Sequence, residues 1–159
     1  MLKEILPRNF DNTYGGRRVA IWLLGAVVAF KTAIALVTIF NGPVAAHTGD
    51  GIPLQQFGAA GVDAVVTLFA VWGVSQLALI LFGVLALLRY RAMVPLIFLV
   101  LLAEHAARRC VLLLMPIAKS GTSPSVYVNF IVFPVLLLAG LGLSLWRGSQ
   151  LQSRGAWTP

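Results

Sequence analysis

The sequence has few charged residues, and this scarcity excludes an ordinary water-soluble domain. Only 11% of the 159 residues are Asp, Glu, Lys or Arg, whereas 59% are apolar. A soluble domain carries about 25% charged residues. A globule of this length would have too few charges to cover its surface. The composition therefore indicates a membrane protein.

Other shortages exclude further classes of protein. The single cysteine, Cys110, excludes an intrachain disulfide and a cysteine-rich metal site. The other histidine, His47, lies in a loop, so His105 lacks the second axial histidine that a transmembrane b-type haem generally needs. No nucleotide-binding loop, H-E-x-x-H motif or G-x-S-x-G elbow occurs, and no extramembrane domain separates the apolar stretches. We therefore predict no catalytic residue and no metal site.

Four long apolar stretches dominate what is present. A helix that crosses a bilayer needs about 20 mostly apolar residues. The stretches that meet this length are about 19–40, 62–88, 92–117 and 126–146. They are continuous, whereas the strands of a membrane barrel are short and alternate. We predict an all-α fold, a polytopic membrane protein with a four-transmembrane-helix bundle over residues 19–146.

The basic residues predict the orientation of this bundle, because cytoplasmic loops are enriched in Lys and Arg. Eight of them flank the spans on one side: Lys3, Arg8, Arg17, Arg18, Arg89, Arg91, Arg147 and Arg154. The opposite side has only Lys119, and the outer loop 41–61 has none. We expect both termini, the basic segment 1–18 and the tail 147–159, to be cytoplasmic. Most of the net charge of +7 then concerns topology, and nucleic acid is not an expected partner.

Three local features carry alternatives. The segment before the first span is either a short helix on the inner leaflet or a basic lead-in that serves topology only. Asp50 followed by Gly51-Ile52-Pro53 looks like the start of a short surface helix in the outer loop, with an irregular loop as the alternative. Pro134, inside the last span, should kink that helix or leave a carbonyl for a neighbour to satisfy.

The polar residues inside the spans are the most informative part of the sequence. A charged side chain at mid-membrane costs about 2.5–3.5 kcal/mol on insertion scales, so each one needs a reason. The predicted intramembrane cluster consists of Lys31, Gln76, Glu104, His105, Arg108 and Arg109. Asp63 lies nearer the outer rim and is a predicted partner for this cluster.

Spacing along the helices suggests which of these residues meet. Glu104 and Arg108 are four residues apart, so they share a helix face and could pair within the helix. Lys31 and Glu104 lie at about the same depth, because both spans run outward and a helix rises 1.5 Å per residue. Our hypothesis is that Lys31 pairs with Glu104, and that one arginine of the third span pairs with Asp63 or reaches outer phosphates.

The role of this cluster stays open between two interpretations. Buried polar groups hold helices together and set their register, and this is the purely structural interpretation. The functional interpretation is a proton or ion path, a site for a lipid or quinone head group, or docking to another subunit. No cofactor is required by the sequence, and ligation of a pigment or haem by His105 is disfavoured because a lone histidine beside a glutamate is more often part of a polar cluster.

The first span also carries a predicted packing stripe. Gly25, Ala29 and Ala33 are spaced four residues apart, nearly opposite Lys31, and small residues at this spacing let helices approach closely. A span with a polar face and a small-residue face would pack on two sides. One side would belong to the bundle, and the other to a further membrane subunit or a second copy of the chain.

Three segments carry a resemblance. Residues 11–15 (DNTYG), 39–42 (IFNG) and 89–92 (RYRA) look like parts of small uncharacterised four-span proteins of proteobacterial inner membranes. The resemblance implies a multi-pass protein of a bacterial inner membrane and brings no established activity. In size and span number alone, the chain is also similar to the DoxX-like group, which is linked to quinone-coupled chemistry.

Two functions follow as expectations. The first is a non-catalytic accessory or assembly subunit of a larger respiratory or photosynthetic membrane complex, which small size and near-total embedding favour. The alternative is a small transporter or channel, or a quinone- or lipid-binding component of an oxidoreductase. The alternative predicts a cavity lined by Lys31, Gln76, Glu104, His105 and Arg108.

Overall fold

The computed structural model describes residues 14–117 and 127–146, together with the single positions 5 and 12. Within these residues the chain is helical and has no strand. The long helices are α2 (Arg18–Phe40), α4 (Ala59–Leu88), α5 (Val94–Leu114) and α7 (Phe133–Leu145). The short ones are α3 (Gly42–Val44), the π-helices η1 (Ala45–Gly49) and η4 (Val128–Val132), and the 3₁₀ turns η2 (Leu54–Gln56) and η3 (Arg91–Met93). The all-helical prediction is confirmed.

Three of these helices are long and apolar enough to cross a membrane. They are α2, α4 and the continuous helix from Val128 to Leu145. The predicted third span is also a helix, α5. It carries three charged residues, Glu104, Arg108 and Arg109, and is therefore less apolar than the other three helices. The prediction of a membrane protein is thus met by three spans of sufficient apolar length. Most of the segment predicted to lie on the inner leaflet falls outside the described residues.

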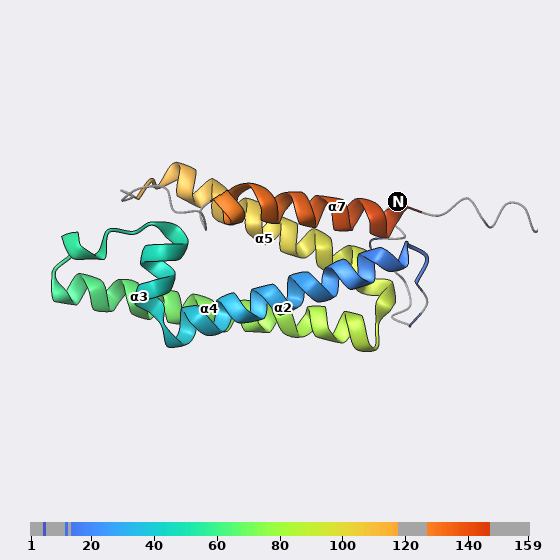
Figure 1. Cartoon of the computed structure of the whole chain (residues 1–159), viewed down its shortest axis with the longest axis horizontal. Coiled ribbons are helices and arrows are strands. Elements are labelled where there is room, and N and C mark those ends of the chain that lie inside the picture. The colour runs from blue at the N-terminus through green and yellow to red at the C-terminus, as the bar shows by residue number, and fades with distance from the viewer. Residues whose placement is uncertain (1–4, 6–11, 13, 118–126, 147–159) are drawn as a thin grey trace, which may run out of the picture.

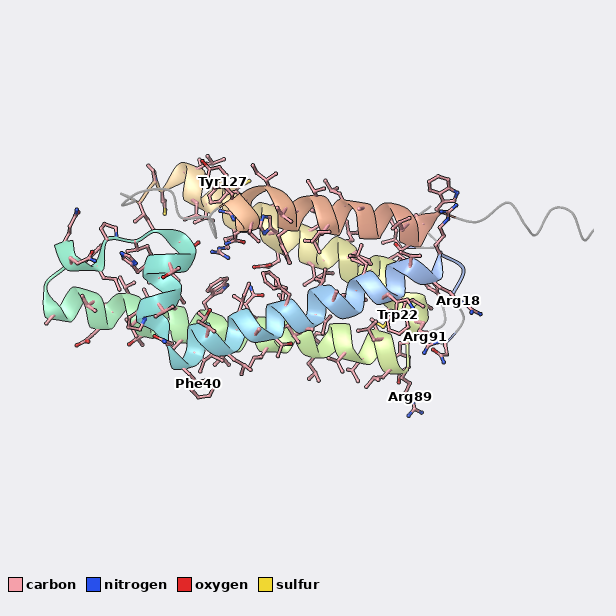
Figure 2. All side chains as sticks on the ribbon, in the orientation of Figure 1. Arg18, Trp22, Phe40, Arg89, Arg91 and Tyr127 are labelled. Carbon is pink, nitrogen blue, oxygen red and sulfur yellow. The ribbon has the colours of Figure 1, made fainter. Side chains whose placement is uncertain are left out.

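The helices form two pairs that lie side by side (Figure 1). Helix α2 packs along α4, and α5 packs along α7. The start of α2, the connection between α4 and α5, and the end of α7 lie at the same end of the bundle (Figure 1). Arg18, Arg89 and Arg91 lie there (Figure 2), and we call this the basic end. The segment from α3 to η2 lies towards the opposite end.

Apolar side chains fill the half of the bundle nearest the basic end. Leu24, Phe98 and Leu137 from α2, α5 and α7 are fully buried. Gly140 allows this close approach, because a Cβ atom at that position would overlap the ring of Phe98. The backbone amide of Arg17 also donates to the carbonyl of Leu143 at 3.2 Å, which joins the start of α2 to α7. The two helix pairs are therefore closed against each other here.

The outer surface of the bundle is apolar. Trp22 of α2 is 80% exposed and Phe40, at the end of the same helix, is 82% exposed. Both project from the bundle in Figure 2. Large exposed apolar side chains also occur along α4 and α5, such as Leu68 and Leu113. A surface of this kind is unfavourable in water and suits contact with lipid.

The outer loop differs from its prediction. The expected helix start at Asp50 is wrong, because Asp50 instead ends the helical segment formed by α3 and η1. Gly51 then takes a φ of 72°, in the left-handed region that favours glycine, and the chain changes direction. Only the short turn η2 (Leu54–Gln56) follows Pro53. This path brings Asp50 back over the bundle.

Candidate functional site

Three helices meet at the carboxylate of Glu104 on α5. Lys31 Nζ of α2 donates to Glu104 Oε2 at 2.9 Å, and Gln76 Nε2 of α4 donates to Glu104 Oε1 at 2.8 Å. Each carboxylate oxygen thus accepts one hydrogen bond from a different helix. The predicted pairing of Lys31 with Glu104 is confirmed, and the bond from Gln76 adds α4 to it. A charge that would be costly in the bilayer is compensated by this arrangement.

Arg108, one turn further along α5, pairs with the outer segment. Its Nη2 donates to Asp50 Oδ1 at 2.7 Å and to Oδ2 at 2.8 Å. Its guanidinium carbon also lies 4.1 Å from the ring centroid of Trp72 on α4, in a cation–π contact. The predicted pairing with Asp63 is therefore wrong for Arg108. Asp63 is exposed on α4, whereas Asp50 lies at the end of the helical segment formed by α3 and η1, where it contacts α5 through Arg108.

Glu104 and Arg108, which could pair within the helix by their spacing, do not form an ion pair with each other. Each of the two side chains forms its ion pair with a residue from another element, Lys31 in one case and Asp50 in the other. An ion pair within α5 would leave Lys31 and Asp50 without opposite charges at close range. The two ion pairs therefore connect α5 to α2 and to the segment that ends at Asp50, and they neutralise four charges.

Arg109 donates a hydrogen bond to a backbone carbonyl of the last span that Pro134 leaves without a donor. In the π-helical turn before α7, the amide of Phe133 bonds to the carbonyl of Val128, five residues back. The next carbonyl in this register, that of Asn129, would need the amide of Pro134, which has no N–H. Arg109 Nη2 donates to the Asn129 carbonyl instead, at 3.1 Å. The prediction that a neighbour satisfies a carbonyl freed by Pro134 is confirmed.

Two further contacts hold Arg109 in this position. Its guanidinium carbon lies 3.4 Å from the ring centroid of Phe130, and its Nε donates to His105 Nε2 at 3.4 Å. With Nε2 as an acceptor, His105 is assigned the neutral tautomer that carries its proton on Nδ1. His105 is only 5% exposed, and its ring lies 5.6 Å from that of Phe133. A metal at Nε2 would displace the bond from Arg109.

A cavity of about 480 Å³ lies between the two helix pairs, beside these charged residues. Its polar wall includes the residues that the functional interpretation of the sequence predicted: Lys31, Gln76, Glu104, His105 and Arg108. Asp50, Trp72 and Asn129 line it as well. Its volume is within the range of about 300–1,000 Å³ that is usual for small-molecule sites.

The other wall of the cavity is apolar and continuous with the outer surface of the bundle. Phe30, Ile34 and Val37 of α2 line the cavity, and each is also 40–45% exposed. Val44 of α3 and Val128 of η4 also line the cavity and are exposed on the outer surface. The cavity therefore combines a charged wall inside the bundle with an apolar rim on its surface. This is the polarity pattern of an amphipathic molecule.

The remaining predicted residues are not brought into this site. Gly25 is half-buried, Ala29 and Ala33 are exposed, and a Cβ atom at Gly25 would meet nothing within 4 Å. The described residues therefore leave most of the predicted packing stripe uncovered, although Ala33 reaches the rim of the cavity. Cys110 is exposed. Among the described residues, no group of three His, Cys, Asp or Glu side chains is placed to hold a metal ion.

Asp50, Trp72, Asn129 and Phe133 were missed as site residues by sequence reasoning. One signal was available for Asp50, since it is the only acid in the outer loop, which contains no Lys or Arg to pair with it. The two aromatic residues carry no such signal, because an aromatic residue in an apolar span is most often a packing or lipid-facing residue.

Comparisons with protein-family models, curated proteins and solved structures found no match for the chain. The resemblance to small four-span inner-membrane proteins therefore stays a prediction. The function has to be argued from the cavity and the charged residues around it.

Proposed function

We propose that the chain is a four-span membrane protein that binds an amphipathic small molecule, a lipid or a quinone, in the cavity between its helix pairs. The observation that carries this proposal is the cavity itself, with all residues of the predicted polar cluster except Arg109 on one wall and an exposed apolar rim on the other. A head group would meet the charged wall, and an apolar tail would pass over Phe30, Ile34 and Val37 into the surrounding lipid.

The proposed membrane placement rests on the distribution of charge. The basic end would be cytoplasmic, in a bacterial inner membrane, because Arg18, Arg89 and Arg91 gather there. Helix α5 would be the fourth crossing. Its charged residues do not oppose this, since Glu104 and Arg108 pair with other elements and Arg109 donates to a backbone carbonyl. The free energy cost of burying them is thereby reduced.

Binding is favoured over conduction by the packing at the basic end. The walls of the cavity include none of the fully buried side chains of that half, Leu24, Phe98 and Leu137. A channel needs a polar path along the whole bundle. A cavity that lies beside the packed basic half suits a molecule that enters from the bilayer and returns to the bilayer.

Fluorescence of Trp72 tests the proposal, because this residue lines the cavity. The chain has four tryptophans, so Trp22, Trp146 and Trp157 are replaced by Phe and the protein is placed in phosphatidylcholine vesicles. The probe is the methyl ester of 5-doxylstearate, whose nitroxide quenches tryptophan at short range. We expect quenching of Trp72 to saturate at a low mole fraction of probe, as binding at a defined site requires.

Two matched controls separate binding from contact with bulk lipid. A variant that retains only Trp22, which is 80% exposed on the bundle surface, should be quenched in proportion to the probe without saturation. Ala45→Phe places a ring at the cavity wall and should abolish saturation at Trp72, whereas Ala107→Phe, at an exposed position of α5, should not. A linear response at Trp72 that Ala45→Phe leaves unchanged would contradict the proposal.

We also propose, as a second function, that the chain is an accessory or assembly subunit of a larger membrane complex. The supporting observation is the uncovered stripe of Gly25, Ala29 and Ala33 on α2, where another helix could approach closely. Extraction from native membranes in a mild detergent should then give co-migration with a larger complex, and Ala29→Leu should weaken it. Migration of the native protein alone in every mild detergent would oppose this role.

A further inference from the structure

The charges in the wall of the cavity balance one another. Two cations, Lys31 and Arg108, and two carboxylates, Glu104 and Asp50, line it. They form two ion pairs with N–O distances of 2.9 and 2.7 Å. Their side chains are 11–22% exposed, so each pair is largely sheltered from solvent. The wall is therefore strongly polar but carries no net charge.

Arg109 is a charged residue beside this wall, and it has no carboxylate partner among the described residues. It does not line the cavity. Its guanidinium is held behind the wall, by the Asn129 carbonyl and His105 Nε2, whose residues line the cavity, and by the ring of Phe130. The residues that a bound head group would touch thus remain the two ion pairs and their neighbours.

The two cations of the wall have N–H groups that take no part in the ion pairs. The ammonium of Lys31 has three N–H bonds and the guanidinium of Arg108 has five. Lys31 uses one of them on Glu104, and Arg108 pairs with Asp50 through Nη2. A ligand that accepts hydrogen bonds, through an ester, carbonyl or hydroxyl oxygen, could bind to the remaining N–H groups while both ion pairs stay intact.

A ligand with a net charge meets a different situation. An anionic head group would be repelled by the nearby Glu104 and Asp50 carboxylates, and to gain a counter-charge of its own it would have to displace one of them from its cation, which is costly for a sheltered ion pair. A cationic head group would be repelled by Lys31 and Arg108 in the same way. Resting on the proposed function, we infer that the cavity selects membrane amphiphiles whose head group accepts hydrogen bonds and carries no net charge.

The test compares two probes whose head groups differ in charge and by one methyl group. Quenching of Trp72 is measured with the methyl ester of 5-doxylstearate and with 5-doxylstearate itself at pH 9, as the carboxylate. In the single-Trp72 protein we expect the ester to reach half-saturation at about a tenfold lower mole fraction than the carboxylate. Equal or tighter binding of the carboxylate would overturn the inference and leave the proposed function standing.

A charge variant with a matched control sharpens the test. Asp50→Asn leaves the wall with one excess positive charge, so the preference should shift towards the carboxylate by about tenfold. Asp63→Asn removes the same charge from an exposed position of α4 outside the cavity, and the preference should not change. Identical behaviour of the two variants would overturn the inference.

Glu104→Gln serves as a second charge variant if Asp50→Asn does not fold. It removes the other carboxylate of the wall and keeps a side chain of similar size. The same shift towards the carboxylate probe is expected, and its absence in a folded protein would count against charge selection. Loss of saturation with both probes in the single-Trp72 protein would refute the proposed function, and the inference would fall with it.

Discussion

At the basic end of the bundle the helices are joined by apolar side chains, whereas in the other half they are joined by charged side chains beside a cavity. Leu24, Phe98 and Leu137 fill the first region without exposed surface. The Lys31–Glu104 and Arg108–Asp50 pairs connect the helices in the second. Helices α2 and α5 are thus held together in two physically different ways along their length.

The difference shows what each kind of contact requires. Dispersion contacts are short-ranged, so an apolar junction holds only where surfaces fit closely and leave no space. An ion pair connects helices through the ends of long side chains and tolerates space beside it. In a bilayer, moreover, apolar residues gain little by leaving lipid, and polar contacts contribute to association. A cavity therefore costs fewer stabilising contacts in the charged half than it would in the apolar half.

The largest effect is expected from filling the close approach in the apolar half. Gly140→Leu would place side-chain atoms in the volume of the Phe98 ring, and overpacking of this kind should cost more than about 3 kcal/mol. The thermal unfolding midpoint in dodecyl maltoside, followed by circular dichroism, measures it. Gly142→Ala is the control, since its Cβ would meet nothing within 4 Å. Equal losses for both would show that α7 does not pack as described.

Removing one partner of the central ion pair should have the next largest effect. Lys31→Met leaves the Glu104 carboxylate with Gln76 as its remaining hydrogen-bond donor, which should cost about 3 kcal/mol. The double variant Lys31→Met/Glu104→Met should recover most of this loss, because it removes both charges. Thermal unfolding of the single and double variants measures the difference. A double variant less stable than the single one would refute the pairing.

Exchange of the two charges tests the role of Gln76. In Lys31→Glu/Glu104→Lys, the amide of Gln76 would have to turn its oxygen towards the new ammonium, and Gln offers either group. We expect partial recovery of stability relative to Lys31→Met. No recovery would mean that the pair depends on features of α2 and α5 other than opposite charge.

A smaller effect is expected at the outer pair. Asp50→Asn removes the charged acceptor of Arg108 and should cost about 1–2 kcal/mol. The loss should be local, so hydrogen exchange at residues 45–52 should accelerate more than in the apolar half. Asp63→Asn is the matched control, with no effect on this segment. The reverse ranking would restore Asp63 as the partner of Arg108.

The smallest effect is expected at Tyr14, near the basic end. Its hydroxyl is buried without a partner in the described residues, and burial raises its pKa from 10.0 to about 12. Because the folded state favours the neutral phenol, this contribution to stability is present below pH 10 and is lost as the pH rises to 12. Tyr14→Phe should change stability by less than about 0.5 kcal/mol at pH 7. It should also reduce the fall in unfolding midpoint between pH 9 and 11, and an undiminished fall would contradict the burial of Tyr14.

The part of the site that could be predicted depends on regular helices. Lys31 and Glu104 were matched by depth, because both helices run from the basic end and their rise per residue is constant. Asp50 could not be placed in this way. Its position depends on the π-helical segment η1 and on the left-handed conformation of Gly51. The cavity depends in turn on how the two helix pairs meet, which hydropathy does not encode.

The hydrogen bond between Arg109 and the carbonyl of Asn129 has a consequence for sequence variation. It exists because residue 134 is a proline, so the arginine is linked to an amino acid that carries no charge. A substitution that returns an N–H group at position 134 would remove the need for the guanidinium, and loss of the guanidinium would make the proline harmful. We therefore expect positions 109 and 134 to vary together in related sequences. A search for compensating charges would not detect the link.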